Sequence, residues 1–350
     1  MKGRNLMLAA AAALLVSSVA GALDLREGRM LLSLDERTTR FSLHYLVDAA
    51  RNRYVSLLSE QDARTTYPTL FWDGKTYRLG ESPEFRISVR REGSSAVVEY
   101  ASSFALVRQS FRFLRSRGAA ETDGLLLQFE IENLTGSPAS AGLRLLLDTY
   151  QGERGKRHFE IDGRGVVNAE LSLTGSSVPI RLVTPGEAGS SLQVQFAGDG
   201  LSRPNRLILS NWKRVNDAEW AFDVSPGRSF TLLPFSIDDS AAALFFEPSD
   251  LRGGGKRTVH LALGNKTEAG FEVPAIPGGT AVPAAAVQDA AVALTVGPDP
   301  FVGARTDIAA LREIIARIDA LLAAGADPDP GKIEELRKLL ENIRSRTREY

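Results

Sequence analysis

The segment Leu127-Gln128-Phe129-Glu130-Ile131-Glu132 alternates apolar and polar residues over six positions. Because successive side chains of a β-strand point to opposite faces of its sheet, this period of two predicts an antiparallel strand with one buried face. The segments 85–90 and 110–115 repeat the pattern. The same alternation, broken by turns, runs from residue 23 to about residue 271 and predicts a mainly β fold.

Three further segments refine the expected sheets. Asp73-Gly74 separates two apolar runs, and these residue types accept the positive φ of a tight hairpin turn. In Leu143–Leu147 leucines replace the alternation, which predicts a central strand covered on both faces. Ser229–Leu233 is one of several additional predicted strands. We therefore predict a large antiparallel β-sandwich over residues 23–271, either as one sandwich or as two fused ones.

The first 22 residues have the pattern of a secretory signal peptide. Lys2 and Arg4 precede an apolar run over residues 6–16, and Ala20-Gly21-Ala22 forms an A-x-A cleavage site. The apolar run is shorter than the roughly 18 to 20 residues that a membrane span needs. We therefore predict cleavage after Ala22, no membrane span in the mature chain, and a periplasmic or secreted bacterial protein.

The chain contains 42 Lys and Arg residues and 43 Asp and Glu residues, which leaves a net charge of −1, with both signs interspersed. This balance offers no electrostatic surface for nucleic acid, so no nucleic acid partner is expected. The chain has no cysteine, and therefore no disulfide and no thiolate metal site.

The sequence changes character after residue 271. Residues 272–304 are rich in Ala, Pro, Gly and Val, which predicts a linker. Residues 305–350 carry apolar residues at steps of three and four, interrupted by a break with two prolines, and predict an α-helical hairpin. Its apolar stripe is expected to bind a protein partner or a second copy of the chain and consists of Ile308, Leu311, Ile315, Ile318, Leu322, Ile333, Leu336, Leu340 and Ile343.

A dense group of polar residues follows the predicted central strand. It includes Asp148, Glu153 and His158. A carboxylate and an imidazole can exchange a proton near neutral pH, so these three are the candidate catalytic residues. The alternative is that Asp148 satisfies the backbone of a turn while the basic residues of the segment are solvated.

A second polar group contains Trp212, Asn216 and Trp220. Indole faces beside amide and carboxylate groups are typical of saccharide binding, so these three are the candidate ligand-binding residues. The alternative is that both tryptophans belong to the core, as large aromatic side chains usually do.

Motifs for metal or cofactor binding are absent from the sequence. The three histidines, His44, His158 and His260, have no zinc-binding spacing, and there is no P-loop, Gly-x-Ser-x-Gly or Gly-x-Gly-x-x-Gly motif. We therefore predict no metal site and no cofactor.

The segments Gly142–Thr149, Asn211–Arg214 and Leu233–Ser240 resemble parts of poorly characterised bacterial secreted proteins with a galactose mutarotase-type β-supersandwich. The resemblance covers about residues 23–263 and implies that fold. Mutarotases use a histidine and a glutamate around the sugar, but no such pair maps onto this sequence residue by residue.

Two functions are compatible with these observations. The absence of a catalytic motif favours a noncatalytic periplasmic structural or adaptor protein that acts through its helical hairpin, such as an accessory of an envelope or periplasmic flagellar assembly. The alternative is a carbohydrate-binding or sugar-modifying, mutarotase-like protein that uses residues 148–158 and the segment Trp212–Trp220.

Overall fold

The computed structural model describes residues 22–58, 65–186, 189–271 and residue 273. Residues 1–21 of the predicted signal peptide lie outside this part of the chain. The predicted linker, apart from residue 273, and the whole predicted helical hairpin with its apolar stripe also lie outside it. No helix among the described residues is long and apolar enough to cross a membrane.

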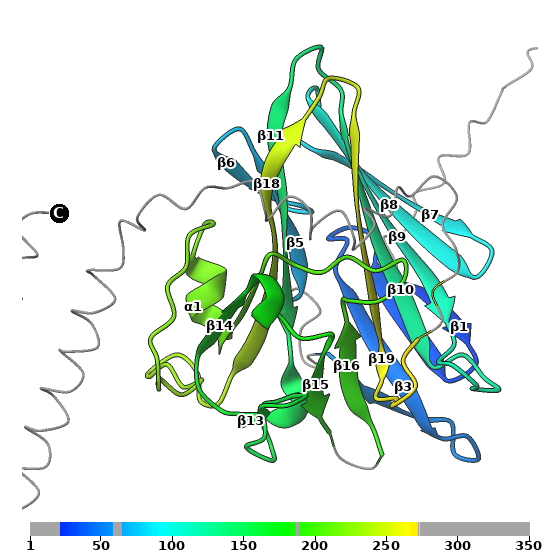
Figure 1. Ribbon diagram of the computed structural model, residues 1–350. Coiled ribbons are helices and arrows are strands. Elements are labelled where there is room, and N and C mark those ends of the chain that lie inside the picture. The colour runs from blue at the N-terminus through cyan, green and yellow to red at the C-terminus, as the bar shows by residue number, and fades with distance from the viewer. Residues whose placement is uncertain (1–21, 59–64, 187–188, 272, 274–350) are drawn as a thin grey trace, which may run out of the picture. The chain divides into compact units, whose positions relative to one another are not determined.

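The described residues form three sheets in which every strand pair is antiparallel (Figure 1). The first has the order β1 (Ala22–Glu27), β2 (Met30–Asp35), β3 (Phe41–Asp48), β4 (Arg53–Ser56). The second has the order β13 (Gly165–Val167), β12 (Phe159–Ile161), β15 (Arg181–Pro185), β16 (Ser191–Gln195), β19 (Lys256–Asn265), β10 (Gly124–Asn133), β9 (Ala105–Leu114), β8 (Ser95–Ala101), β7 (Arg86–Glu92). The third has the order β14 (Leu171–Thr174), β17 (Arg206–Asn211), β18 (Ser240–Leu251), β11 (Ala139–Asp148), β5 (Tyr67–Trp72), β6 (Lys75–Arg78). The helices of this part are α1 (Trp212–Asp217) and the short 3-10 turns η2 (Tyr150–Gly152) and η3 (Gly175–Ser177).

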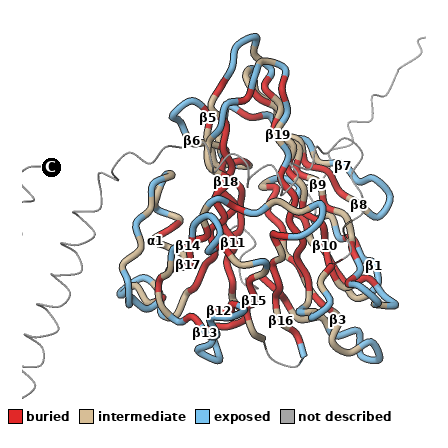
Figure 2. The backbone as a smooth tube through the Cα atoms, viewed as in Figure 1, coloured by how far each residue is buried: buried red, intermediate tan, exposed pale blue. Residues whose placement is uncertain are grey.

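One hydrophobic core joins the three sheets. It contains Leu32 from the four-stranded sheet, Phe129 from the nine-stranded sheet and Leu145 from the six-stranded sheet. Figure 2 shows the buried residues concentrated along the middle of the strands. The burial of these inward faces stabilises the fold through the apolar surface removed from water. The prediction of a mainly β, antiparallel fold is confirmed.

The local predictions are confirmed at several strands. In β10, Leu127, Phe129 and Ile131 are buried, while the polar residues between them are half-buried. Asp73 and Gly74 have φ values of 46° and 84° and connect β5 to β6 in a tight turn. Strand β11 pairs with β18 on one side and β5 on the other, and its leucines are buried.

The prediction of a strand over Ser229–Leu233 is wrong. The Phe230 carbonyl accepts a hydrogen bond from the side chain of Asn211 at 2.8 Å, and its ring packs edge-on against His158 and Phe159. The amide of Leu232 bonds the Ser236 carbonyl at 2.9 Å. The alternation of apolar and polar residues in this segment therefore reflects a buried phenylalanine in a loop. The backbone groups of the loop form local hydrogen bonds instead of pairing with a strand.

Paired glycines allow β10 and β19 to approach each other closely beneath an aromatic ring. Gly124 and Gly264 are register partners, and a Cβ atom on Gly264 would lie 2.5 Å from the Asp123 carbonyl oxygen and 2.8 Å from the ring of Phe271. We expect Gly264→Ala to lower the free energy of unfolding by about 1–3 kcal/mol, because neither backbone nor ring can withdraw easily. Urea denaturation measures this difference.

The matched control is Gly136→Ala, where nothing lies within 4 Å of an added Cβ atom. It is expected to change the free energy of unfolding by no more than about 0.5 kcal/mol. Equal denaturation midpoints for the two variants would contradict the packing argument.

Candidate functional site

The outer face of the six-stranded sheet carries the polar residues that concern function. In β11, Leu143, Leu145 and Leu147 belong to the main core, so Arg144 and Asp148 point to the opposite face. Helix α1 lies on that outer face, away from the nine-stranded sheet (Figure 1). It packs through Val215 in a second apolar cluster together with Tyr67 and Leu146.

Helix α1 is fixed at its start by Asn211. The Asn211 side-chain oxygen accepts a hydrogen bond from the Arg214 amide at 3.3 Å, as an N-cap residue does. Its side-chain nitrogen donates to the carbonyls of Phe230 and Asp239 at 2.8 and 3.1 Å and to the Ser236 hydroxyl at 2.9 Å. One side chain therefore joins the helix to the loop that precedes β18.

The candidate ligand-binding residues of the Trp212–Trp220 segment all lie on this outer face. The Trp212 indole donates to the Thr65 carbonyl at 2.8 Å, and the Trp220 indole donates to Glu247 at 3.2 Å. Both rings are partly buried against the second apolar cluster. Asn216 accepts a hydrogen bond from the Tyr67 hydroxyl at 2.8 Å and lines a pocket. The two tryptophans thus hold the segment on the sheet, while Asn216 faces an opening.

The pocket has a volume of about 390 Å³ and lies between β5, β6, β11 and the end of α1. This volume is in the range of small-molecule sites. Its lining consists almost entirely of polar residues: Thr69, Thr76, Arg78, Glu81, Ser82, Pro83, Arg144, Asn216, Asp217, Ala218 and Glu219. Hydrogen-bond donors and acceptors of both charges therefore converge on one cavity.

Arg144 is the most deeply buried charged residue of the pocket, with 2% of its surface exposed. Its guanidinium donates to the Ala218 carbonyl at 2.8 Å and lies 3.4 Å from the Thr69 hydroxyl. Its Nε has no hydrogen-bond partner in the described part of the chain. Burial lowers the pKa of Arg144, and the charges of two neighbouring arginines act in the same direction, while Tyr67 opposes them.

Arg78 is the second cationic residue that lines the pocket. It donates to the Asn216 carbonyl at 3.1 Å, and its guanidinium lies 4.4 Å from the centre of the Tyr67 ring. Glu81 pairs with it at 3.4 Å. The carboxylates of Asp217 and Glu219 supply acceptors on the same cavity. A ligand with several hydroxyl groups could bond both kinds of group at once.

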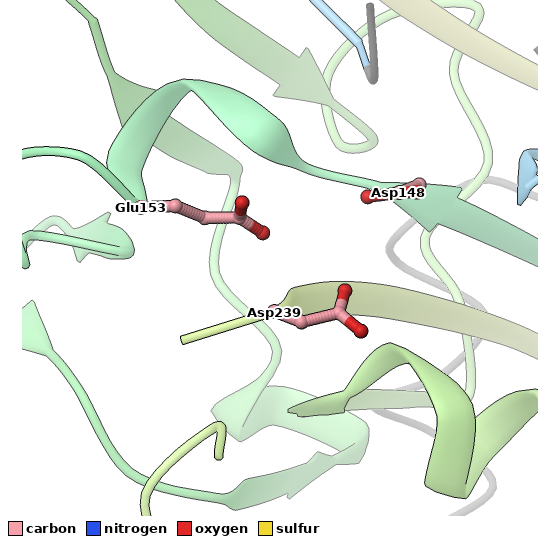
Figure 3. Close-up of side chains that lie close together, drawn as sticks. All are labelled: Asp148, Glu153 and Asp239. Carbon is pink, nitrogen blue, oxygen red and sulfur yellow. The ribbon is translucent and has the colours of Figure 1, made fainter. Parts of the chain in front are cut away.

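A separate acidic cluster lies at the other end of the same sheet face. Asp148 ends β11, Glu153 follows η2, and Asp239 precedes β18 (Figure 3). Antiparallel pairing of β11 with β18 brings these chain segments together, and one carboxylate oxygen from each lies within 4.8 Å of the others. Glu153 also accepts a hydrogen bond from the Ser240 amide at 2.8 Å.

The three carboxyl groups cannot all carry a full charge at this separation without a counter-charge. Burial raises the pKa of Glu153 to about 8, with further increases from Asp148, Asp239 and Asp238, while the Ser240 amide opposes them. Burial also raises the pKa of Asp239. The raised pKa of Glu153 keeps a proton on its carboxyl group near neutral pH, and the spacing of the three oxygens would also suit a cation, although the sequence analysis predicted no metal site.

His158 was the third candidate catalytic residue. It is buried, and its ring packs edge-on against Phe230 at 4.7 Å between centres. Burial lowers its pKa, with Asp238 opposing. Its Nδ1 has no hydrogen-bond partner in the residues the structure describes. The structure therefore brings Asp148 and Glu153 together and places the His158 ring against an aromatic side chain.

The sequence analysis did not identify several residues of the two sites. Asp239 lies about ninety positions from Asp148 and joins the cluster only through strand pairing. The sequence did contain a signal for Arg144. A charged residue within the leucine run Leu143–Leu147 is expected to be buried, and a buried charge usually has a specific role. Arg78 and Glu219 carry no such signal, since exposed charges are common on strands and loops.

No family model matches this chain, and no curated protein matches it. Solved structures do match. A galactose mutarotase-like protein from Lactobacillus casei ATCC 334 aligns with 70% of this chain and 100% of its own, at 11% identity and a TM-score of 0.42. A GalM/aldose epimerase homologue from C. elegans aligns with 70% of this chain and 98% of its own, at 12% identity and a TM-score of 0.42. The chain resembles galactose mutarotase-like proteins.

That resemblance is diffuse, as the sequence indicates. A TPR-domain containing protein from Parabacteroides distasonis ATCC 8503 aligns with 73% of this chain and 49% of its own, at 10% identity and a TM-score of 0.43. At such identities the comparison describes the fold alone, so a ligand has to be argued from the side chains of the site.

The main functional prediction from the sequence, a noncatalytic adaptor, is wrong. Several of the solved proteins that match are described as mutarotase-like or as aldose epimerase proteins, which agrees with the carbohydrate alternative instead. The helical hairpin on which the adaptor interpretation depended lies outside the described residues.

Proposed function

We propose that this chain binds a carbohydrate in the pocket formed by Arg78, Arg144, Asn216 and the neighbouring acidic residues. The observation that carries the proposal is Arg144, a buried guanidinium whose Nε lacks a partner among the described residues and which lines an open polar cavity. A buried guanidinium without a carboxylate beside it is costly, and an acceptor group on a ligand bound in the pocket would offset part of that cost.

The composition of the lining supports a saccharide over an apolar ligand. Guanidinium and amide groups of Arg78, Arg144 and Asn216 can donate to sugar oxygens, while Glu81 and Glu219 can accept from sugar hydroxyls. Most small-molecule pockets are largely apolar with a few polar groups, whereas nine of the eleven residues that line this pocket are polar or charged. The lining therefore suits a ligand that carries several polar groups.

A second candidate activity is acid–base chemistry on a saccharide at the cluster of Asp148, Glu153 and Asp239. The observation that favours it is the pKa of Glu153, raised to about 8, which keeps a proton donor beside two other carboxyl groups near neutral pH. Asp148 and Arg144 are four residues apart on the same face of β11, about 13 Å along the strand. The two sites therefore face the same side of the sheet.

The binding proposal predicts measurable affinity for a saccharide and its loss in a pocket variant. We expect isothermal titration calorimetry to detect at least one member of a panel of neutral and acidic mono- and disaccharides. Arg78→Gln is expected to weaken binding roughly tenfold to a hundredfold, because a hydrogen bond to a charged group contributes about 1.5–3 kcal/mol. Arg78 lies at the pocket edge with a half-exposed side chain, so this variant should fold.

The matched control is Arg91→Gln, since Arg91 is exposed on β7 of the nine-stranded sheet. It should bind saccharides as the unchanged protein does. Absence of binding across the whole panel, or equal affinities for the Arg78 and Arg91 variants, would refute the proposal.

A further inference from the structure

We propose that the saccharide bound in this pocket carries an anionic group, such as a carboxylate or a phosphate, that pairs with Arg144. This inference rests on the proposed carbohydrate function and specifies its ligand class. Two pocket arginines, Arg78 and Arg144, lie against the rings of Tyr67 and Phe245, and two further arginines contact the same rings.

Four arginines surround these two rings. Arg40 and Arg78 lie 4.7 and 4.4 Å from the centre of Tyr67, whereas Arg144 and Arg206 lie 6.0 and 4.0 Å from the centre of Phe245. Such stacking stabilises each guanidinium, but it supplies no opposite charge. The group therefore concentrates positive charge at one place on the sheet.

Three of these arginines have a carboxylate partner. Glu81 lies 2.7 Å from Arg40 and 3.4 Å from Arg78, and Glu247 lies 2.9 Å from Arg206. Arg40 is as deeply buried as Arg144, with 1% of its surface exposed, and shows how this chain pairs a buried guanidinium.

Arg144 differs from the other three. Within the described part of the chain Arg144 has no carboxylate partner, and the charges that act on it are those of Arg78 and Arg206, which are both positive. Its contacts in that region are a carbonyl and a hydroxyl, and its Nε contacts no acceptor. A buried cation without a counter-ion is unfavourable, and a planar guanidinium pairs best with a carboxylate or phosphate.

The other charged residues of the pocket restrict the kind of ligand that can carry the anionic group proposed to pair with Arg144. Asp217 is held by Lys213 at 2.8 Å, and Glu81 is held by Arg40 and Arg78, but Glu219 adds a further negative charge. A ligand that is anionic on all sides, such as inorganic phosphate, would meet these carboxylates. A ligand with one anionic group and several hydroxyls would place the anion on Arg144 and its hydroxyls on the acceptors.

The experiment compares ligands that differ in charge but hardly in shape. Galacturonate and glucuronate are titrated into the full-length protein by calorimetry, each beside its neutral methyl ester, together with galactose 6-phosphate, galactose and inorganic phosphate. We expect at least one acidic sugar to bind ten times or more tightly than its neutral counterpart, and Arg144→Gln to remove that difference.

The outcomes separate this inference from the proposal on which it rests. Equal affinity for an acid and its ester, with saccharide binding intact, overturns the anionic group and leaves the carbohydrate function standing. Inorganic phosphate binding as tightly as any sugar overturns the carbohydrate function. The comparison of acid and ester uses the unchanged protein, so the answer does not depend on whether Arg144→Gln folds.

Discussion

Replacing Glu170 by alanine is expected to lower the free energy of unfolding by about 3–5 kcal/mol. The Glu170 side chain is fully buried, and it pairs with Arg214 of α1. It also accepts a hydrogen bond from the Ser210 hydroxyl at 2.7 Å and from the Ser225 amide at 2.7 Å. The substitution leaves a partly buried guanidinium and two donors without their acceptor, and that loss is the source of the large cost.

This ion pair matters for function because it anchors the helix that carries Asn216. Glu170 precedes β14, and Arg214 lies in α1, so the pair joins the edge of the six-stranded sheet to the element that borders the pocket. Urea denaturation measures the change. Glu268→Ala is the matched control, because Glu268 is 77% exposed in its pair with Arg181 and should cost no more than about 1 kcal/mol. Equal midpoints for the two variants would contradict the account of α1.

The second large effect is a loss of stability as pH rises through the titration of Glu153. Its pKa is about 8 in the folded chain, against 4.5 for a free glutamate, so the folded state holds a proton that the unfolded state releases. The resulting stabilisation is fully present below about pH 4.5 and is lost as pH rises through about 8. At roughly 1.4 kcal/mol per pKa unit, and allowing for screening by solvent, the loss should reach about 2–4 kcal/mol.

Glu153→Gln isolates this contribution. Glutamine can still accept the hydrogen bond from the Ser240 amide, but it does not titrate. We expect the unchanged protein to lose stability between pH 6 and pH 9 relative to this variant, as followed by thermal unfolding. A stability difference that is independent of pH would exclude a protonated Glu153.

Measuring stability with added Ca²⁺ tests whether a proton or a bound cation neutralises this acidic cluster. If Asp148, Glu153 and Asp239 held a metal ion, added Ca²⁺ would stabilise the unchanged protein at pH 7 and would stabilise Glu153→Gln much less. If a proton neutralises the cluster, Ca²⁺ should change the stability of neither protein at pH 7.

Local sequence pattern predicted several strands correctly. Burial follows the alternation of β10 residue by residue, and the Asp73-Gly74 turn follows from the backbone preferences of those two residue types. The pattern failed at Ser229–Leu233, because a buried Phe230 within a loop produces the same alternation as a strand. It also did not reveal α1, whose six residues depend on the Asn211 cap and on packing against the sheet.

The candidate sites were less accessible to prediction because they depend on strand pairing. Asp148 and Glu153 are close in sequence and were named together, but Asp239 reaches them only through the pairing of β11 with β18. The pocket combines Arg78 of β6, Arg144 of β11 and Asn216 of α1, and no short motif encodes such a combination. Asn216 was identified from its polar neighbours, whereas the tryptophans beside it pack on the sheet.

The most direct measurement of the central claim is the NMR signal of the Arg144 Nε–H group during a saccharide titration. The signal is assigned by its disappearance in Arg144→Lys and is followed while the tightest-binding saccharide of the panel is added. Binding in the pocket predicts a saturable shift of this resonance, with the Arg91 resonance unchanged. A saccharide that binds without shifting the Arg144 resonance, or a panel in which no saccharide shifts it, would contradict the claim that this pocket is a carbohydrate site.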